Sequence, residues 1–446
     1  MSSFSGLRIA LSSMQAQQIA LEVTGHNIAN VQTKGYSRQE AVFSANNPYQ
    51  AVLYNGQAGN GVRITDVRRS VDPYMEQRIQ NEQGRLNAWT ARSEMLKKVE
   101  GSINSLDIPD RLNSFFNAWH NLSLDPNLDY VRFAVQQEGA NLIDTLRTAG
   151  TQLVEIRDEI DYSIKDIVSR VNLLGKEIVN LNIEIIGSQK PNDLLDKRDG
   201  LLKELVGLTG AKVAYHSDST VSVTLPVKMG FIEEAGEMKL IEKNIFTEIP
   251  LEAEVIATGG RLYGLKQVRD GEINSYLTKL SNIAESLTSQ INQIHVQGIN
   301  EGPDATKNTG INFFSETDFQ DKVTWIDSWS LSDEVANDER YIAANNGKTG
   351  GIGMVALDVY NLGTRFTKFV SGFLSEIGTA RKTAYFQETA HQDILVEMEN
   401  ARASVSGVSL DEEFAKMIQF QRAYEASAKV LTVVDEMLAA LINTVR

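Results

Sequence analysis

The stretch "TGHNIANVQTKGYSRQ", residues 24–39, constrains the fold more than any other. It follows a helix-like run and then places two asparagines, a glycine and a tyrosine where a helix would have to stop. Asn27 and Asn30 tolerate the turn conformations that end helices and can bond to the last carbonyls, and Gly35 can adopt a φ that a side chain forbids. We therefore expect a helix that ends within this stretch, followed by a turn that leaves Tyr36 available for packing.

The residues before the turn repeat in steps of three and four. Six of these eight positions are apolar, which predicts a heptad seam along an N-terminal helix. The positions are Phe4, Leu7, Leu11, Met14, Gln18, Leu21, Gly25 and Ile28.

A second seam runs along the C-terminal residues. Ser409 and Glu412 have the spacing of a capping box, and Gly407 interrupts whatever precedes them, so we expect a helix over about 410–445. Nine of its eleven seam positions are apolar: Leu410, Glu413, Met417, Phe420, Tyr424, Ser427, Leu431, Val434, Leu438, Leu441 and Val445. The two terminal helices are economical partners for each other, although each could instead pack on the protein's own core.

Long amphipathic patterns fill most of the chain between the two seams. Asp72 followed by Pro73 is typical of a helix start, and further apolar stripes predict helices over about 129–186, 273–294 and 363–404. Alternating residues predict a strand over about 62–67 and a small β module over 210–262, whereas 303–350 reads as loops and short strands. The expected fold is mainly α: a long-helix bundle with paired terminal coiled-coil helices and a small inserted β module.

These patterns suggest three parts. Residues 1–70 and 405–446 would form a terminal axial domain of coiled-coil character. A helical bundle would take the central helices, and the β-rich insert would take 210–262, to which 303–350 can be added. The bundle comprises 71–209, 263–302 and 351–404.

Composition excludes several classes of protein. The 446 residues are 42% hydrophobic, enough for a sizeable core, and carry a net charge of −15, which disfavours nucleic acid and anionic lipid as partners. The chain has no cysteine, so disulfides, thiolate metal sites and thiol chemistry are excluded. Polar residues interrupt the apolar run at the N-terminus, and we expect neither a cleaved signal peptide nor a membrane span.

No motif points to catalysis, a metal or a cofactor. The five histidines are dispersed without metal-ligand spacing: His26, His120, His216, His295 and His391. Gly347-Lys348-Thr349 resembles the end of a phosphate loop, but Ile342 stands where its first glycine must be. Asp193, Asp196 and Asp199 could form a carboxylate cluster, but a solvated helix face with local ion pairs is the simpler interpretation. We expect a protein that is not an enzyme.

The two ends of the chain resemble one family. "NIANVQTKGYSRQ" is similar to the N-terminal signature of the bacterial flagellar axial proteins, the rod, hook and hook-associated proteins, and "SGVSLDEEFAKMIQFQRAYEASAKVLTVVDEMLAALINTVR" is similar to their C-terminal end. "GNGVRITDVRRSVDPYMEQRI", "NDLLDKRDGLLKEL", "GGRLYGLKQVRDGEI" and "NQIHVQG", with Asn292, His295 and Gly298, resemble the hook-associated members. Hook proteins are β-rich after the first motif, whereas long helices follow here.

The resemblance implies a structural adapter that joins hook to filament and on which the filament is built. It implies export without a cleaved signal, through the flagellar type III apparatus, to an extracellular place on the flagellum. The implied partners are further copies of the chain, the hook protein, hook-associated protein 3 and an export chaperone on the C-terminal helix, with no nucleic acid and no membrane insertion. Another axial protein, a hook or distal rod protein, is the alternative; a secreted adhesin or coiled-coil scaffold belongs to a different class.

The two seams and the signature stretch together supply the expected assembly interface. The signature loop would join the inner helical layer of the axial tube to the outer domains and contact neighbouring subunits, although a locally packed loop would need the same glycine and tyrosine. The interface residues are Phe4, Leu7, Leu11, Met14, Leu21, Asn27, Ile28, Asn30, Gly35, Tyr36, Phe420, Tyr424, Leu431, Val434, Leu438 and Leu441.

Overall fold

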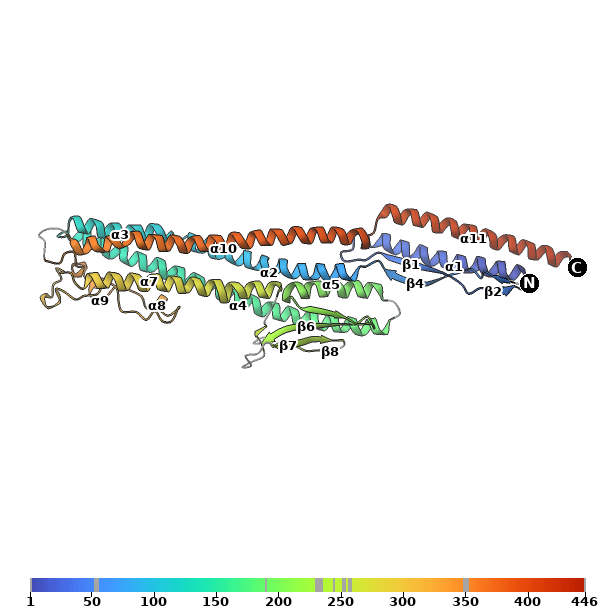
Figure 1. Ribbon diagram of the computed structural model, residues 1–446, viewed down its shortest axis with the longest axis horizontal. Helices are drawn as coiled ribbons and strands as arrows, with labels where there is room; N and C mark the ends of the chain where they lie inside the picture. The colour runs from blue at the N-terminus through green and yellow to red at the C-terminus, as the bar shows by residue number, and fades with distance from the viewer. Residues whose placement is uncertain are drawn as a thin grey trace. The chain divides into compact units, whose positions relative to one another are not determined.

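The computed structural model of the chain is dominated by long helices (Figure 1). It describes residues 2–51, 56–188, 191–228, 236–243, 245–250, 254–255, 259–347 and 353–444. The helices are α1 (Ser2–Ala29), α2 (Pro73–Asn104), α3 (Ile108–Leu124), α4 (Asp129–Gly187), α5 (Asn192–Thr209), α6 (Gly260–Lys266), α7 (Asn274–His295), α8 (Trp325–Ser328), α9 (Asp333–Asn337), α10 (Met354–Ser406) and α11 (Leu410–Thr444). The mainly α fold is therefore confirmed.

Antiparallel pairs make up the β structure of the described residues. β1 (Gln39–Ala45) pairs with β4 (Val62–Arg69), and β2 (Tyr49–Ala51) pairs with β3 (Gly56–Ala58). A five-stranded sheet has the order β5-β6-β7-β8, with β9 also on β6. Its strands are β5 (Lys212–Tyr215), β6 (Val221–Lys228), β7 (Gly236–Glu242), β8 (Ile245–Phe246) and β9 (Glu254–Val255). The small β module expected over 210–262 is present.

The chain divides into two compact units. Unit 1 comprises Met1–Arg85, Arg170–Thr258 and His391–Arg446, and unit 2 comprises Leu86–Ser169 and Gly259–Ala390. Unit 1 therefore takes in both terminal helices and the five-stranded sheet. The three-part division expected from the sequence is finer than this and stays a prediction.

In unit 1 the sheet packs on the C-terminal part of α4. The side chain of Asn172 donates to the Ile249 carbonyl at 2.8 Å and accepts from the Ile249 N–H at 2.9 Å, so a helix residue substitutes for a neighbouring strand. A Cβ at Gly175 would overlap the ring of Phe246, and glycine is what allows the sheet to approach the helix. The inner side of the sheet is apolar, with Val221, Val223, Leu225, Leu240 and Ile241 buried.

Unit 2 contains an aromatic core that joins helices to an irregular segment. Phe313 lies 5.2 Å from Trp119 of α3 and 5.7 Å from His295 of α7 between ring centroids, and Trp325 and Trp329 are also fully buried. Residues 303–347 contain the short helices α8 and α9, two 3-10 turns and isolated bridges rather than the expected short strands. Buried aromatic side chains anchor this segment to the helices, because each removes a large apolar area from water.

Helix boundaries agree with the sequence signals at several ends. Oδ1 of Asp72 accepts from the N–H groups of Tyr74 and Met75, as expected of an N-cap before α2. The last helix begins at Leu410, as predicted. However, α10 begins at Met354, nine residues before its expected start. Gly363 therefore lies inside the helix, where the absence of a side chain makes room for the Phe116 ring, 2.9 Å from the position that a Cβ would take.

Candidate functional site: the terminal helix pair and the signature loop

Helices α1 and α11 lie side by side and run in opposite directions (Figure 1). Three contacts define their register. A Cβ on Gly6 would lie 3.4 Å from Cγ2 of Val434, the hydroxyls of Ser13 and Ser427 bond to each other at 2.8 Å, and the amide of Asn27 donates to Glu413 at 2.9 Å. Steps of seven and fourteen residues along α1 match equal steps backwards along α11, which is the repeat of an antiparallel coiled coil. The predicted pairing of the terminal helices is therefore confirmed.

The face of α1 that meets α11 differs from the predicted seam. The buried side chains of α1 are small or polar: Ala10, Ala16, Ala20, Thr24 and Asn27. The predicted positions Leu7, Met14, Leu21 and Ile28 are half-buried, and Leu11 is 46% exposed. Small side chains let two helices approach closely, so the close contact uses the alanines and leaves the larger residues beside it. The predicted register of the α1 seam is wrong for the pairing with α11.

On α11 most of the predicted seam faces α1, whereas Leu410 is 41% exposed. Glu413 and Val434 are buried, and Phe420, Tyr424, Leu431 and Leu438 are half-buried. Phe420 also packs against Phe43 of β1, with ring centroids 5.9 Å apart, so the β1–β4 hairpin covers part of the pair. The side chains of Phe4 and Leu441 lie outside the described part of the structure.

Asn27 is the centre of a hydrogen-bond network that closes the pair at one end. Its amide donates to Glu413 Oε2 and to the Gln39 carbonyl, each at 2.9 Å. Its Oδ1 accepts from the Gln39 N–H at 2.9 Å and from the Tyr36 hydroxyl at 2.8 Å. All the hydrogen-bonding capacity of this buried amide is used, which fixes the signature loop to both terminal helices.

Glu413 is a buried carboxylate that the same loop neutralises. Its side chain is 1% exposed, and Nε of Arg38 donates to Oε1 at 2.8 Å. Arg38 also pairs with Glu412 at 3.2 Å, so the residue expected to cap α11 is engaged with the loop. The Arg38 N–H donates to the Ser406 carbonyl at 2.9 Å, which ties the loop to the end of α10. Pairing with Arg38 and the hydrogen bond from Asn27 offset part of the desolvation cost of this buried carboxylate, and removal of a partner would be strongly destabilising.

The turn after α1 is built largely as the sequence predicts. Asn30 donates its amide to the His26 carbonyl at 3.0 Å, and Gly35 has a φ of 86°. Asn27 itself lies within α1, not in the turn. The Tyr36 hydroxyl lies 3.0 Å from Nδ1 of His26, and burial, then the carboxylates of Asp193, Asp196 and Glu413, raises the pKa of the Tyr36 phenol. The phenol therefore stays protonated and can donate to Asn27.

Helix α5 holds this loop from the other side, contrary to the sequence interpretation. Asp196 accepts from the Ser37 N–H at 2.9 Å, and Arg69 of β4 reaches both Asp196 at 2.7 Å and Asp199 at 2.8 Å. Asp193 accepts from Gln39 at 2.8 Å and lies 3.5 Å from the His26 ring. All three carboxylates have partners more than 120 positions away, and Asp196 and Asp199 are largely buried. The interpretation as a solvated face with local ion pairs holds only for the exposed side chain of Asp193 and for the 3.9 Å contact of Asp199 with Arg198. Local spacing gave no signal of these partners.

The outer face of the terminal pair remains apolar and exposed. On α1 it includes Ile9, Leu11 and Ile19. On α11 it includes Leu410, Phe414, Ile418, Val430, Val433, Met437 and Ile442. Large apolar patches on the surface of a monomer usually mark places where another molecule binds. The outer face of the terminal pair has this character.

Other candidate sites have structural explanations. His295 is fully buried, donates from Nδ1 to the Ile311 carbonyl at 2.7 Å and accepts at Nε2 from the Ala343 N–H at 2.9 Å. Asn292 bonds to the backbone of Phe313 and Phe314, so the "NQIHVQG" motif holds the segment after α7. Within the described residues, no group of three or more His, Cys, Asp or Glu side chains is placed to hold a metal ion. Lys348 and Thr349 of the phosphate-loop-like stretch lie outside them.

Helix length and hydropathy also bear on membranes. Across the part of the chain that the structure describes, none of the helices has the combination of length and apolar character that crossing a bilayer requires.

Family descriptions match three parts of the chain. Residues 93–314 match the flagellar hook-associated protein FlgK helical domain. Residues 7–36 match the flagella basal body rod protein, and residues 401–444 match the flagellar basal body rod FlgEFG protein C-terminal region. The two terminal matches contain α11 and the signature loop up to Tyr36.

Full-length relatives agree with these matches. The Flagellar hook-associated protein 1 of Bacillus subtilis (strain 168) is 26% identical over 503 aligned residues, which cover 99% of this chain and 98% of that protein. Over nearly its whole length, the chain is therefore similar to flagellar hook-associated protein 1. The family members from Salmonella typhimurium (strain LT2) and Escherichia coli (strain K12) are each 23% identical over 97% of this chain and 98% of their own length. The resemblance of both termini to flagellar axial proteins is confirmed.

A solved structure of the family is also similar. The flagellar hook junction protein FlgK from Burkholderia pseudomallei is 19% identical, with a TM-score of 0.48, over 54% of this chain and 47% of that one.

Proposed function

We propose that the chain is a structural subunit of the bacterial flagellum that joins the hook to the filament. The observation that carries this proposal is the family relationship over nearly the whole chain, including both terminal helices and the central helical region. The role is mechanical, and no step of it calls for a catalytic group. It consists in presenting one surface to the hook side and another to the filament side.

The terminal pair supports this role because it combines a fixed inner contact with an open outer face. Inside, the Asn27–Glu413 bond sets the register of α1 against α11. Outside, exposed side chains such as Ile418 and Val433 can be buried by a neighbouring subunit. Each large apolar side chain that leaves water on assembly would contribute about 1–2 kcal/mol, so several of them suffice to drive association of neighbouring copies.

Several of the interface residues predicted from the sequence belong to the inner contact. Asn27 and Tyr36 bond to each other within one copy, and Val434 is buried against α1. Leu11 is exposed and, together with the exposed α11 residues of the outer face, is the better candidate for contacts between copies. We therefore place the contact between subunits on the outer face of the pair instead of on the predicted α1 seam.

Specific partners follow from the same proposal. Further copies of the chain, the hook protein and hook-associated protein 3 would cover the outer face in the assembled flagellum. Before assembly the apolar residues of α11 need protection, and an export chaperone on this helix would supply it. The subunit would be made in the cytoplasm and exported without a cleaved signal peptide.

Localisation tests the proposal directly. Antibody against the full chain should label the boundary between hook and filament in sheared hook-filament preparations. A strain that lacks the gene should have hooks without filaments and should release flagellin into the medium, and the wild-type chain should restore both. Label along the hook or on the rod would instead favour another axial protein, and label on the cell surface away from flagella would favour an adhesin.

A further inference from the structure

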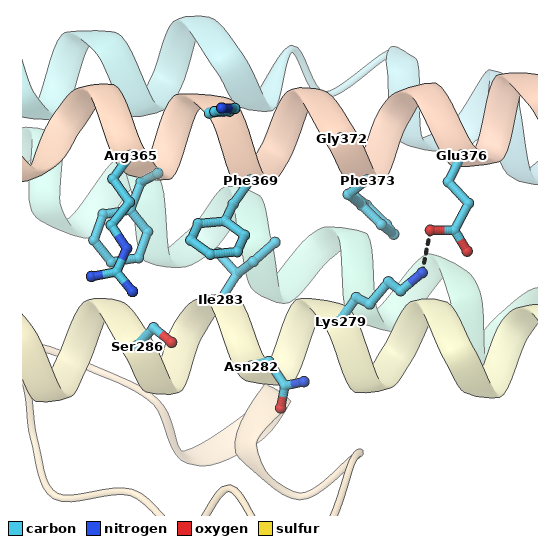
Figure 2. Close-up of a pocket in the computed structure, with 11 residues that line it drawn as sticks. Lys279, Asn282, Ile283, Ser286, Arg365, Phe369, Gly372, Phe373 and Glu376 are labelled. Atoms are coloured by element: carbon cyan, nitrogen blue, oxygen red, sulfur yellow. Dashed lines mark hydrogen bonds and ion pairs between the residues drawn. The ribbon is translucent and has the colours of Figure 1, made fainter.

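Unit 2 contains an apolar groove between α7 and α10 (Figure 2). Its volume is about 770 Å³, and Ile283, Phe369 and Phe373 provide apolar surface. Phe369 is 54% exposed although it lies in the middle of a long helix. A phenylalanine left open between two helices is energetically unfavourable in an isolated chain, which indicates that another surface covers it.

The rim of this groove is basic on a chain that is acidic overall. Lys279, Arg365 and Lys368 line it, and the single lining carboxylate, Glu376, forms an ion pair with Lys279. The Arg365 guanidinium lies 5.7 Å from the ring centroid of Phe369, so a positive charge borders the apolar surface. An apolar groove with a net positive rim selects an occupant that is both apolar and acidic.

Residues 124–133, at the turn from α3 to α4, have both properties and also belong to unit 2. Leu124, Tyr130 and Phe133 are exposed, with Tyr130 at 70%, and Asp125 and Asp129 lie between them in the sequence. We call these residues the α3–α4 tip.

The α3–α4 tip is held firmly from within. Arg132 is fully buried; it donates to the Pro126 carbonyl at 2.7 Å, bonds to the Ile342 carbonyl and pairs with Glu301 at 3.0 Å. The apolar side chains of the tip are therefore presented on a fixed backbone. A preformed protrusion loses little conformational entropy when it binds.

The tip of one copy cannot reach the groove of the same copy. The Gly353 N–H donates to the Ser123 carbonyl at 3.1 Å, which places the tip beside the start of α10. Phe369 follows Met354 by fifteen residues, or about 22 Å along the helix at 1.5 Å per residue. The occupant of the groove must therefore come from another molecule.

We propose that the α3–α4 tip of one copy docks in the α7–α10 groove of a neighbouring copy. This inference rests on the proposed function, because an axial polymer places many copies in contact. The contact is heterologous, since two different surfaces meet, and such contacts propagate into rings or helical arrays. Tyr130 and Phe133 would enter the groove while Asp125 and Asp129 face Arg365 and Lys368.

Cysteine cross-linking tests the contact, because the chain has no cysteine of its own. Flagella that carry the double variant Tyr130→Cys/Phe369→Cys should give a ladder of oxidised multimers, whereas each single variant should give none. The matched control is Tyr162→Cys/Phe369→Cys, since Tyr162 is an equally exposed tyrosine of unit 2. We expect at least about fivefold more multimer from the first pair than from the control.

Three cross-linking outcomes would overturn the inference. They are a yield equal to the control, a disulfide within one monomer, and an adduct of Phe369→Cys with a protein of different mass, which would make another flagellar protein the occupant. A thermal melt of each variant checks that it folds.

Charge reversal provides a second measurement. Arg365→Glu/Lys368→Glu should reduce the multimer yield about fivefold, and Asp125→Lys/Asp129→Lys in the same chain should restore it. A yield unaffected by reversal would contradict the proposed orientation.

The same variants separate this inference from the proposed function. A variant that labels the hook–filament boundary but gives no ladder overturns the docking contact alone. If the chain is absent from flagella, the junction role is wrong, and cross-linking of the purified full-length chain at high concentration then decides the contact by itself.

Discussion

The side-chain amide of Asn27 donates a hydrogen bond of 2.9 Å to Oε2 of Glu413 and so joins residues 386 positions apart. Both side chains are about 1% exposed. The bond connects the signature stretch near the N-terminus to the first turn of the C-terminal helix. The two terminal motifs of the sequence therefore form one hydrogen-bonded site in the folded chain.

Replacement of Asn27 by Ala should lower the free energy of unfolding of unit 1 by about 1–3 kcal/mol, because Glu413 and Gln39 lose a buried partner. Tyr36→Phe should cost about 1 kcal/mol through loss of the hydroxyl bond to Asn27. Denaturant titration measures both, and Gln32→Ala, at an exposed position of the same loop, is the control.

A double-mutant cycle refines this test. Asn27→Ala and Glu413→Gln together should cost less than the sum of the single changes, with a coupling energy of about 1 kcal/mol or more. Additive effects would show that the two residues do not depend on each other.

Val433 and Val434 form a matched pair on α11, since they are adjacent and identical but Val433 is 48% and Val434 6% exposed. Val434→Asp should destabilise the terminal pair by about 2–4 kcal/mol because it buries a carboxylate against Gly6. Val433→Asp should melt like the parent and yet fail to support filament attachment, so that cells do not swim.

Thermal melting, motility and the amount of secreted protein should be measured for both variants. Secretion matters because an export chaperone on α11 would be affected by the same change. Normal swimming by secreted Val433→Asp would remove the outer face from the assembly surface.

His295 predicts an acid-sensitive stability of unit 2. Burial, with a smaller contribution from Arg132, lowers the pKa of His295 to about 4, below the usual value of 6.5. As pH falls below 6.5 the unfolded chain takes up this proton first, so the contribution is complete above 6.5 and is lost by about 4, a change of roughly 3 kcal/mol.

Denaturant titrations of the parent and of His295→Gln between pH 7.5 and 4 measure this difference. The glutamine amide can still donate and accept but does not titrate, so the variant should lose less stability than the parent on acidification. Identical slopes would assign the acid sensitivity to carboxylates.

Two glycines of unit 2 provide a packing test. A Cβ at Gly264 of α6 would overlap the Ala88 carbonyl of α2, whereas nothing lies within 4 Å of a Cβ at Gly271. Gly264→Ala should cost about 2–4 kcal/mol, because two backbones would have to separate. Gly271→Ala should be neutral or stabilise by up to about 1 kcal/mol, as alanine is the better helix former. Thermal melts compare the two, and equal melting temperatures would show that α6 can move away from α2.

The sequence was sufficient to predict what depends on neighbouring residues. The N-cap at Asp72, the start of α11 at Leu410 and the left-handed Gly35 all follow from interactions within about four positions. Heptad positions of α11 such as Glu413 and Val434 lie on the face that meets α1. The two terminal motifs also indicate the family before any contact is known.

Only the tertiary structure decided which distant groups meet. The close contact on α1 uses Ala10, Ala16 and Ala20, which carry little hydrophobic signal, because the distance between two helices is set by the partner as well as by the helix itself. The partnership of Arg69 with Asp196 and Asp199 spans more than 120 residues, so no local spacing encodes it. Burial of His295 likewise depends on the segment that packs over it. Periodicity reports a helix and its faces; desolvation and pairing of charges depend on contacts that the folded chain alone creates.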